Sequence, residues 1–514
     1  MDEKRGVEDA GTNDLPTVMR DGIKLHPQPT SDPLDPLNWT RWRKNCILAI
    51  VMSLYFMFTY ITTTTVPSFP QIQEQYGIDL GQVNWTVAIP ALGLSVGPLF
   101  WSSLADIYGR RLIFIIGTII AFAATIGAAK AQDYQGYMAA RFFQGFGVSP
   151  AATVGLAIIN DIYYEYQRGL KVGLWVLAID MGLIVGPLIG GFVDLVSEAW
   201  CNWLTSIFFA TILAAEIAFL PETLYPRNHM LRVMPYAETT GVADIEKTER
   251  RASIATDESL PRTKTLAFIN IKPVPGMKHP KPWDSILRFA LTFKYLTVFS
   301  TVWIFCFGWY WWVLSIITFI PSAYVQYSPQ IQGLLFIGLI LGTLFSELFF
   351  SGRLSDWLTL KLAKRNNGIR LPEMRLWLAY PAALLSAIGL IIWGISIDKA
   401  YHWIVGQIAF FLFAAGIQMG NTAVASYIVD CYPLQSMSII TFYSVFLNLS
   451  AFVNPFFIAP WVTAQGYTWT FAVQGIITFW FCVPALACVH YFGPKMRQWS
   501  GMPGWVNPEY DTIA

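Results

Sequence analysis

Two charged side chains lie within apolar stretches that are long enough to cross a membrane. Asp180 is near the middle of one stretch, and Arg141 is about one helical turn inside another. A charge in hydrocarbon is costly unless it is paired or faces water, so an intramembrane carboxylate is a functional candidate by default. We therefore interpret Asp180 as a proton carrier or an anchor for a cation, with a structural hydrogen bond to a neighbouring helix as the alternative. For Arg141 the alternative is a side chain that extends to the nearby outer interface.

A series of glycines follows Asp180 in the same stretch. Gly182, Gly186 and Gly190 recur every fourth residue, so they share one helix face and allow a second helix to approach closely. Asp180 lies roughly 160° around the helix from Gly182 and is therefore off this face. A proline among the glycines removes a backbone donor and favours a bend. The complete pattern has six fixed positions: Gly173, Gly182, Gly186, Pro187, Gly190 and Gly191.

Uncharged side chains in other apolar stretches could contact a small molecule. Trp309 and Trp312 belong to an aromatic cluster that begins deeper than an interfacial belt requires, and such rings could bind flat apolar molecules or cations. Asn421 and Asn448 are polar candidates for the same cavity. The sequence contains no nucleotide-binding loop, no metal-ligand spacing and no catalytic constellation. We therefore expect that the protein is not an enzyme and has no cofactor and no metal.

The elements that position these residues are membrane spans. Only 13% of the residues are charged and 54% are hydrophobic, whereas soluble domains carry about a quarter charged residues. We predict twelve segments that can cross about 30 Å of hydrocarbon. Their approximate ranges are 45–67, 83–104, 112–129, 137–159, 170–192, 202–221, 292–319, 331–350, 376–397, 403–428, 438–463 and 469–492.

The charges between these segments predict the topology. Of the 34 Lys and Arg residues, only Lys130 and Lys399 fall in the loops that the positive-inside rule assigns to the outer side. Both termini are therefore predicted to be cytosolic. Two bundles of six spans flank a polar loop that we expect to be mobile, and parallel repeats around a central substrate site are a known transporter design. The predicted parts are an N-terminal tail at 1–44, bundles at 45–221 and 292–492, a cytosolic loop at 222–291 and a C-terminal tail at 493–514.

The loop after the second span carries a charged motif. It reads Ser102-x-Leu104-Ala105-Asp106-x-x-Gly109-Arg110-Arg111 and resembles the loop signature of the major facilitator superfamily, although Ser102 replaces a glycine and Ile107 replaces a basic residue. A trace of the motif recurs at Asp356, 250 residues after Asp106. The resemblance implies an all-α membrane protein with 12 transmembrane helices in two pseudo-symmetric six-helix bundles. It also implies a latch that closes the cytosolic side in one state, formed by Asp106, Gly109, Arg110, Arg111 and Asp356.

Two further motifs resemble the same superfamily. Arg141-x-x-Gln144-Gly145 is similar to its fourth-helix motif, whose arginine is implicated in proton coupling. The pattern of glycines around Pro187 resembles the fifth-helix motif of its proton-coupled antiporters, and we expect this glycine face to pack between the two halves. Weaker strings resemble the fungal 12-span drug:proton antiporters; they include Asp35-Pro-Leu-Asn38-Trp39, Asn160-Asp161 and Leu220-Pro-Glu222-Thr223.

The resemblance implies a proton-coupled exporter of small organic molecules, such as drugs, toxins or secondary metabolites. Arg141 and Asp180 would couple proton movement to alternating access. The expected partners are a small-molecule substrate, protons and the lipid bilayer, without nucleic acid, and we expect a functional monomer in the plasma membrane. Two alternatives remain open. One is proton-linked or facilitative uptake of a nutrient or polyamine, which the antiporter motif disfavours, and the other is a membrane sensor that does not transport.

Overall fold

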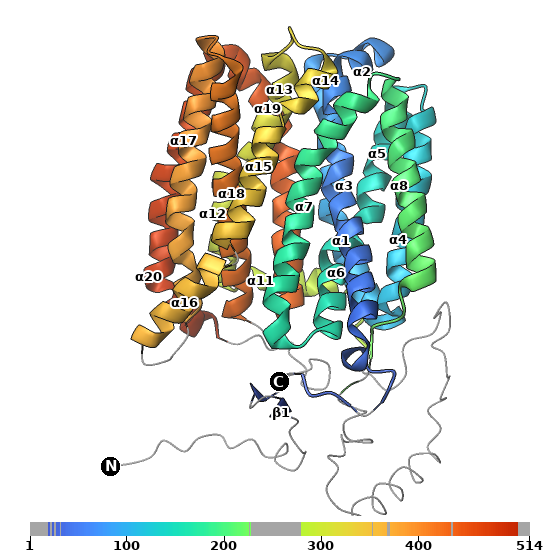
Figure 1. Cartoon of the computed structure of the whole chain (residues 1–514), viewed down its shortest axis with the longest axis vertical. Helices are drawn as coiled ribbons and strands as arrows, with labels where there is room; N and C mark the ends of the chain where they lie inside the picture. Colours follow the sequence, from blue (N-terminus) through green and yellow to red (C-terminus); the bar gives the residue numbers. More distant parts are fainter. Residues whose placement is uncertain are drawn as a thin grey trace, which may run out of the picture.

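The computed structural model describes residues 19–20, 23–24, 27–30, 32–225, 227, 279–351, 353–366, 371–432 and 435–501. Nearly all of them are helical, and the long helices stand side by side and run roughly along the long, vertical axis of the molecule (Figure 1). Two short antiparallel strands, β1 (Met19–Arg20) and β2 (Ile23–Lys24), precede the first helix. In this part of the chain, eleven helical stretches are long and apolar enough to cross a membrane.

The N-terminal half is built from the first six predicted spans. Thr40 caps the N-terminus of the first helix, where its side-chain oxygen accepts the Arg43 backbone N–H. Asp79 caps the second span in a capping box with Gln82. Pro150 occupies a first-turn position and divides the fourth span in two. The elements are η1 (Pro36–Asn38), α1 (Arg41–Thr63), η2 (Val66–Ser68), α2 (Phe69–Tyr76), α3 (Leu80–Tyr108), α4 (Arg110–Lys130), α5 (Tyr134–Val148), α6 (Pro150–Ile162), α7 (Glu165–Val193) and α8 (Glu198–Phe219).

The C-terminal half repeats this plan with more breaks. Gly466 has φ 75° and ψ 174° and separates the last two spans, which are otherwise continuous from Ser436 to Ser500. With this break, the twelve-span prediction is confirmed. The elements are α11 (Asp284–Thr292), α12 (Leu296–Phe305), η3 (Cys306–Tyr310), α13 (Trp312–Ala323), α14 (Pro329–Leu334), α15 (Ile337–Ser346), η4 (Glu347–Ser351), α16 (Arg353–Arg365), η5 (Pro372–Leu378), α17 (Ala379–Asp398), α18 (Trp403–Cys431), α19 (Ser436–Ile476), η7 (Ile477–Phe481) and α20 (Cys482–Ser500).

The end of the predicted central loop contains helix α11, which sequence reasoning missed. Its polar residue Ser285 is buried, and the backbone N–H of Ser285 donates to Ser103 Oγ of α3 at 2.9 Å. Its large apolar residues Ile286 and Leu287 are exposed. The helix therefore ties the start of the C-terminal half to the N-terminal half. Residues 228–278 of the predicted loop lie outside the described residues.

The glycine face of α7 packs against α1, within the N-terminal half. A Cβ on Gly182 would lie 2.1 Å from the Phe56 carbonyl oxygen, and one on Gly190 would lie 1.9 Å from that of Thr64. The expectation that this face lies between the halves was wrong. The three glycines do share one side of α7, as their spacing predicts. The helix that approaches this side is α1 of the same bundle.

Neighbouring positions on α7 do reach the other half. A Cβ on Gly191 would lie 2.5 Å from the Pro329 carbonyl oxygen of α14, and one on Gly173 would lie 3.2 Å from Glu347 Oε1. Gly191 is one residue beyond the α1-facing row and is rotated by about 100° from Gly190. The six-position motif therefore serves two interfaces, one with α1 and one between the halves.

Candidate functional site

A pocket lies between the two halves of the molecule. In this conformation it is narrow, with a cavity volume of about 30 Å³, and its walls are mostly apolar. The helices α1, α3 and α7 contribute residues from one half, and η3, α13 and α19 contribute residues from the other. Its lining residues are Thr59, Thr62, Val87, Ala91, Leu94, Ile179, Leu183, Tyr310, Trp311, Val313, Leu314, Leu447, Asn448 and Ala451.

A second narrow pocket, with a cavity volume of about 20 Å³, adjoins the first, and the two share Leu183 and Val313. Its wall contains the carboxylate residue Asp180 and the amide residue Gln418. Asp180 comes from α7 and Gln418 from α18, so this pocket also lies between the halves. Asp180 is therefore buried at the interface between the halves.

Asp180 is connected to the C-terminal half by hydrogen bonds. Asn421 Nδ2 of α18 donates to its carboxylate oxygens, at 3.1 Å to Oδ2 and 3.4 Å to Oδ1. The Tyr443 hydroxyl of α19 donates to Asn421 Oδ1 at 2.5 Å. Because the hydroxyl engages the amide oxygen, the amide nitrogen is directed to Asp180. The carboxylate is 4% exposed, so these partners replace water.

Arg141 is completely buried, so its side chain does not extend to the outer interface. Its guanidinium donates to the Thr86 carbonyl oxygen at 3.1 Å, to Gln144 Oε1 at 3.0 Å and to the Thr62 carbonyl oxygen at 3.4 Å. Thr62 lines the first pocket, which places Arg141 directly behind the pocket wall. In the described part of the chain, no carboxylate pairs with Arg141 and no hydrogen bond joins it to Asp180.

The tryptophans predicted for the cavity pack elsewhere. Trp309 lies inside the C-terminal half, where its Nε1 donates to Ser386 Oγ at 3.0 Å, and Trp312 Nε1 donates to the Gly308 carbonyl oxygen at 2.9 Å. The rings that line the first pocket are Tyr310 and Trp311. The cause is the π-helical turn η3, which inserts an extra residue and rotates the following side chains around the helix.

The predicted asparagines have different surroundings. Asn448 lines the first pocket, and its Nδ2 donates to the Ser444 carbonyl oxygen one turn earlier at 2.8 Å. Asn421 is outside the wall of that pocket and instead holds Asp180. Tyr443, which directs the Asn421 amide, was missed because nothing in its local sequence distinguishes it from a core tyrosine.

The loop motif is assembled at the start of α4. Arg110 forms an ion pair with Asp106 at the end of α3, and its Nε lies 3.5 Å from Asp161 Oδ2 at the end of α6. Gly109 has φ 104°, a conformation that favours glycine. The side chain of Asp356 lies outside the described residues.

Glu222 closes this assembly from the segment after α8. It accepts the backbone N–H of Arg110 at 2.8 Å and of Arg111 at 3.2 Å, which are orphan donors at a helix N-terminus. A Cβ on Gly109 would lie 2.2 Å from Glu222 Oε2, so the glycine also makes room for the carboxylate. Sequence reasoning did not connect Asp161 and Glu222 with the loop motif, although both lie in the short strings noted above.

Two similar ion pairs lie at helix ends in the C-terminal half. Arg375 Nε is 2.5 Å from Asp430 Oδ2 at the end of α18. Arg497 of α20 pairs with Glu373 at the start of η5. Asp430 therefore has the place in the second bundle that Asp161 has in the first, at the end of its fourth span.

Comparisons with known proteins identify the family. The model described as the Major Facilitator Superfamily matches residues 51–455. The chain is similar to Protein HOL1 of Saccharomyces cerevisiae, with 25% identity over 93% of this chain and 91% of HOL1. It is also similar to the MFS-type efflux pump MFS2 of Trichophyton rubrum, with 26% identity over 91% of this chain and 75% of that pump.

Solved structures share the fold. The xylose transporter XylE from E. coli superposes with a TM-score of 0.58 at 14% identity, covering 87% of this chain and 99% of that one. The human organic anion transporter MFSD10 has a TM-score of 0.55 at 17% identity and covers 86% and 99%. Since the family match spans most of the chain and the twelve helices form two bundles around a shared pocket, this multi-pass membrane protein belongs to the major facilitator superfamily of transporters.

Proposed function

We propose that this protein is a proton-coupled transporter that exports small organic molecules by alternating access. The observation that carries the proposal is Asp180, a buried carboxylate that lines a pocket between the halves and is held by Asn421 from the opposite half. When the halves rock against each other, this hydrogen bond must break and form again. Binding of a proton or a substrate to the carboxylate is therefore linked to the conformation of the transporter.

Competition at one carboxylate explains exchange. A proton or a cationic group of the substrate can neutralise Asp180, but both cannot do so together. Entry of a proton then favours release of the substrate on the outer side. Exchange of a proton for a monovalent cation moves no net charge, so the pH difference drives it. For an uncharged substrate one net charge crosses, and 100 mV then supplies about 2.3 kcal/mol, which sustains a substrate gradient of more than about tenfold.

Arg141 is the second proposed coupling residue. Its hydrogen bonds go to neutral groups of α1, α3 and its own helix α5, one of them the carbonyl of the pocket residue Thr62. A shift of α1 on substrate binding would change these bonds. The buried positive charge is therefore sensitive to whether the pocket is occupied.

The direction of transport is proposed from the antiporter motif of α7 and from the efflux pumps among the relatives. Cytosolic termini, a plasma-membrane location and a functional monomer belong to the same proposal. A second candidate is proton-linked or facilitative uptake of a nutrient or polyamine. Asp180 favours a cationic substrate in that case, because a carboxylate can bind an organic cation that arrives from either side.

Transport by the purified protein in lipid vesicles tests the proposal. A proton gradient is imposed, and movement of tetraphenylphosphonium, spermidine and fluorescein is followed for the native chain, Asp180→Asn and Arg141→Ala. Asp194→Asn is the matched control, since Asp194 ends the same helix but accepts from Gln71 outside both pockets. We expect a probe to move against the proton, and both site variants, but not the control, to lose the response to the gradient.

Two results would change the conclusion. Movement that ignores the proton gradient in the native protein would exclude coupling. Movement in the same direction as the proton would support uptake instead of export.

A further inference from the structure

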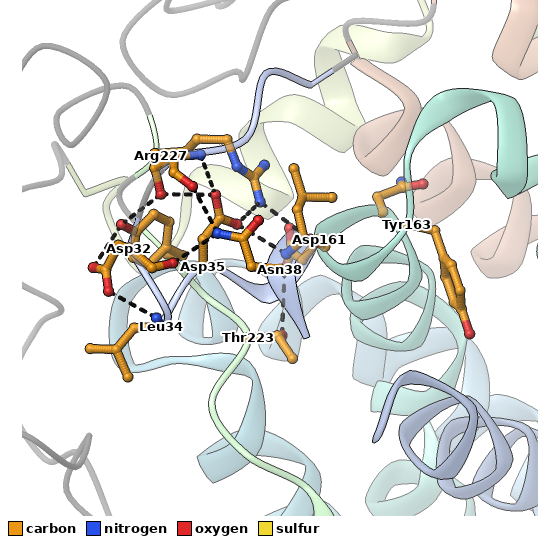
Figure 2. A network of polar contacts seen from close by, with 12 residues as sticks. Asp32, Leu34, Asp35, Asn38, Asp161, Tyr163, Thr223 and Arg227 are labelled. Carbon is orange, nitrogen blue, oxygen red and sulfur yellow. Dashed lines mark hydrogen bonds and ion pairs between the residues drawn. The ribbon is translucent and has the colours of Figure 1, made fainter. Parts of the chain in front are cut away.

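A segment before the first span is folded against the cytosolic end of the N-terminal half (Figure 2). We call residues 27–30 and 32–39 the N-terminal strap. Asp35 is at its centre and is completely buried. Its carboxylate accepts from the Thr30 backbone N–H at 2.9 Å and from the Leu37 backbone N–H at 3.0 Å. The strap therefore has a defined conformation that is organised around one acidic side chain.

The strap is joined to the segment that follows α8. Arg227 Nη2 lies 3.2 Å from Asp35 Oδ1, and the arginine side chain is only 4% exposed. The Tyr225 hydroxyl donates to Asp32 Oδ2 at 2.9 Å. Burial, together with the nearby Asp32 carboxylate, raises the pKa of Tyr225 well above its usual value, so the hydroxyl remains a donor. A buried ion pair whose partner is removed leaves an uncompensated charge, which makes this docking site sensitive to substitution.

The same arginine reaches the latch. Arg227 Nη2 also donates to the Asp161 carbonyl oxygen at 3.2 Å, within the last turn of α6 (Figure 2). The Asp161 carboxylate is 3.5 Å from Arg110 Nε of the latch and accepts from the Thr223 hydroxyl at 3.4 Å. Carbonyl groups at a helix C-terminus have no partner within the helix, and a cation there stabilises the final turn. Asp161 is therefore fixed from one side by Arg227 and presented on the other side to Arg110.

We propose that Asp35 and Arg227 are positioning residues of the cytosolic latch. The docked strap holds Arg227, Arg227 holds the last turn of α6, and that turn keeps Asp161 beside Arg110. Loss of the Asp35–Arg227 pair loosens this turn, weakens the latch and shifts the transporter toward its cytosol-open state. The inference rests on the proposed function, because it takes the Asp106–Arg110 motif as the latch that closes the cytosolic side.

The test measures how readily the interior is reached from the cytosol. A cysteine is introduced by Ala414→Cys, since Ala414 lines the second pocket, and its reaction with a membrane-impermeant maleimide is timed in inside-out vesicles, with the protein lacking this cysteine as background. Asp35→Asn and Arg227→Met should each raise the reaction rate roughly five- to tenfold. Arg227→Lys should restore most of the slow rate, because an ammonium group can still reach the same acceptors.

Two further variants separate the possible failures. Glu373→Gln removes one partner of a buried ion pair at the cytosolic end of the other half, without contact to Asp161, and should leave the rate unchanged. Arg110→Met acts on the latch itself and should raise the rate. A rate that does not respond to Arg110→Met would contradict the latch and hence the proposed mechanism.

A response to Arg110→Met without a response to Asp35→Asn and Arg227→Met would overturn the role of the strap alone. An equal response to Glu373→Gln would also overturn it, since the effect would then reflect general loosening. Asp35→Asn keeps the size and an acceptor oxygen of the native side chain. It therefore tests the inference even where Arg227→Met reduces the yield of folded protein.

Discussion

Replacement of Gly182 by alanine should destabilise the protein, although alanine is the better helix former. The added Cβ would lie 2.1 Å from the Phe56 carbonyl oxygen of α1, whereas ordinary contacts begin at 3.4 Å. Helices α1 and α7 would therefore have to separate by about 1.3 Å at this point, the difference between these distances. The clash involves backbone, so a change of rotamer cannot relieve it.

The size of the effect follows from three terms. Overpacking costs about 1–3 kcal/mol. Separation also stretches the interhelical bonds from Thr59 Oγ1 to the Ile179 carbonyl at 2.5 Å and from Thr63 Oγ1 to the Leu183 carbonyl at 2.9 Å, each worth about 0.6 kcal/mol in a membrane. Alanine regains up to about 1 kcal/mol of helix propensity. The net loss in the free energy of unfolding should be about 1–3 kcal/mol.

The measurement is unfolding by SDS titration in mixed micelles, followed by far-ultraviolet circular dichroism. Gly127→Ala is the control, because a Cβ at Gly127 meets only Ala140 Cβ at 3.7 Å in the same kind of helix. We expect the control to be neutral or more stable by up to about 1 kcal/mol. If Gly182→Ala were as stable as the native chain, or if Gly127→Ala lost as much, close packing of α1 on α7 would not explain the glycine spacing.

Three further outcomes are expected. Arg141→Lys should lose most transport at unchanged expression, since an ammonium group cannot reproduce the separate bonds of the guanidinium; retained transport would exclude a geometric role. Gly109→Ala should destabilise the protein by about 1–3 kcal/mol in the same SDS titration, whereas Gly77→Ala, which has positive φ but open space, should lose only about 1 kcal/mol. Asn421→Leu should reduce proton-driven transport more than Asn448→Leu does in the vesicle assay, because only Asn421 binds Asp180; equal losses would contradict that role.

The main features of the fold could be predicted from the sequence because hydropathy and loop charge directly reflect the bilayer. The break inside the last long helix was also expected, since two spans were predicted where α19 continues past Gly466. Helix α11 could not be predicted in the same way. It is short, and it follows a polar region that reads as a loop, so its periodic apolar residues were not considered separately.

The candidate site was only partly predictable. Asp180 could be identified because a carboxylate within a membrane span is costly and therefore indicates a function. Its pairing with Asn421 could not, because the contact depends on how the two halves pack together. The choice between Trp309 and Trp311 depended on the π-helical turn η3, which sequence periodicity does not report. The glycine spacing predicted a close helix contact, but a repeated small residue does not specify which helix approaches it.

The ion pair between Asp35 and Arg227 joins residues that are 192 positions apart, one before the first span and one after the sixth. The first bundle is thereby closed into a loop by its own ends. During synthesis, Asp35 emerges long before its partner, and all six spans must be inserted before Arg227 is available. The pair can therefore form only once all six spans have been made, and a fragment cut at the last membrane residue would lack the ion-pair partner of a buried acid.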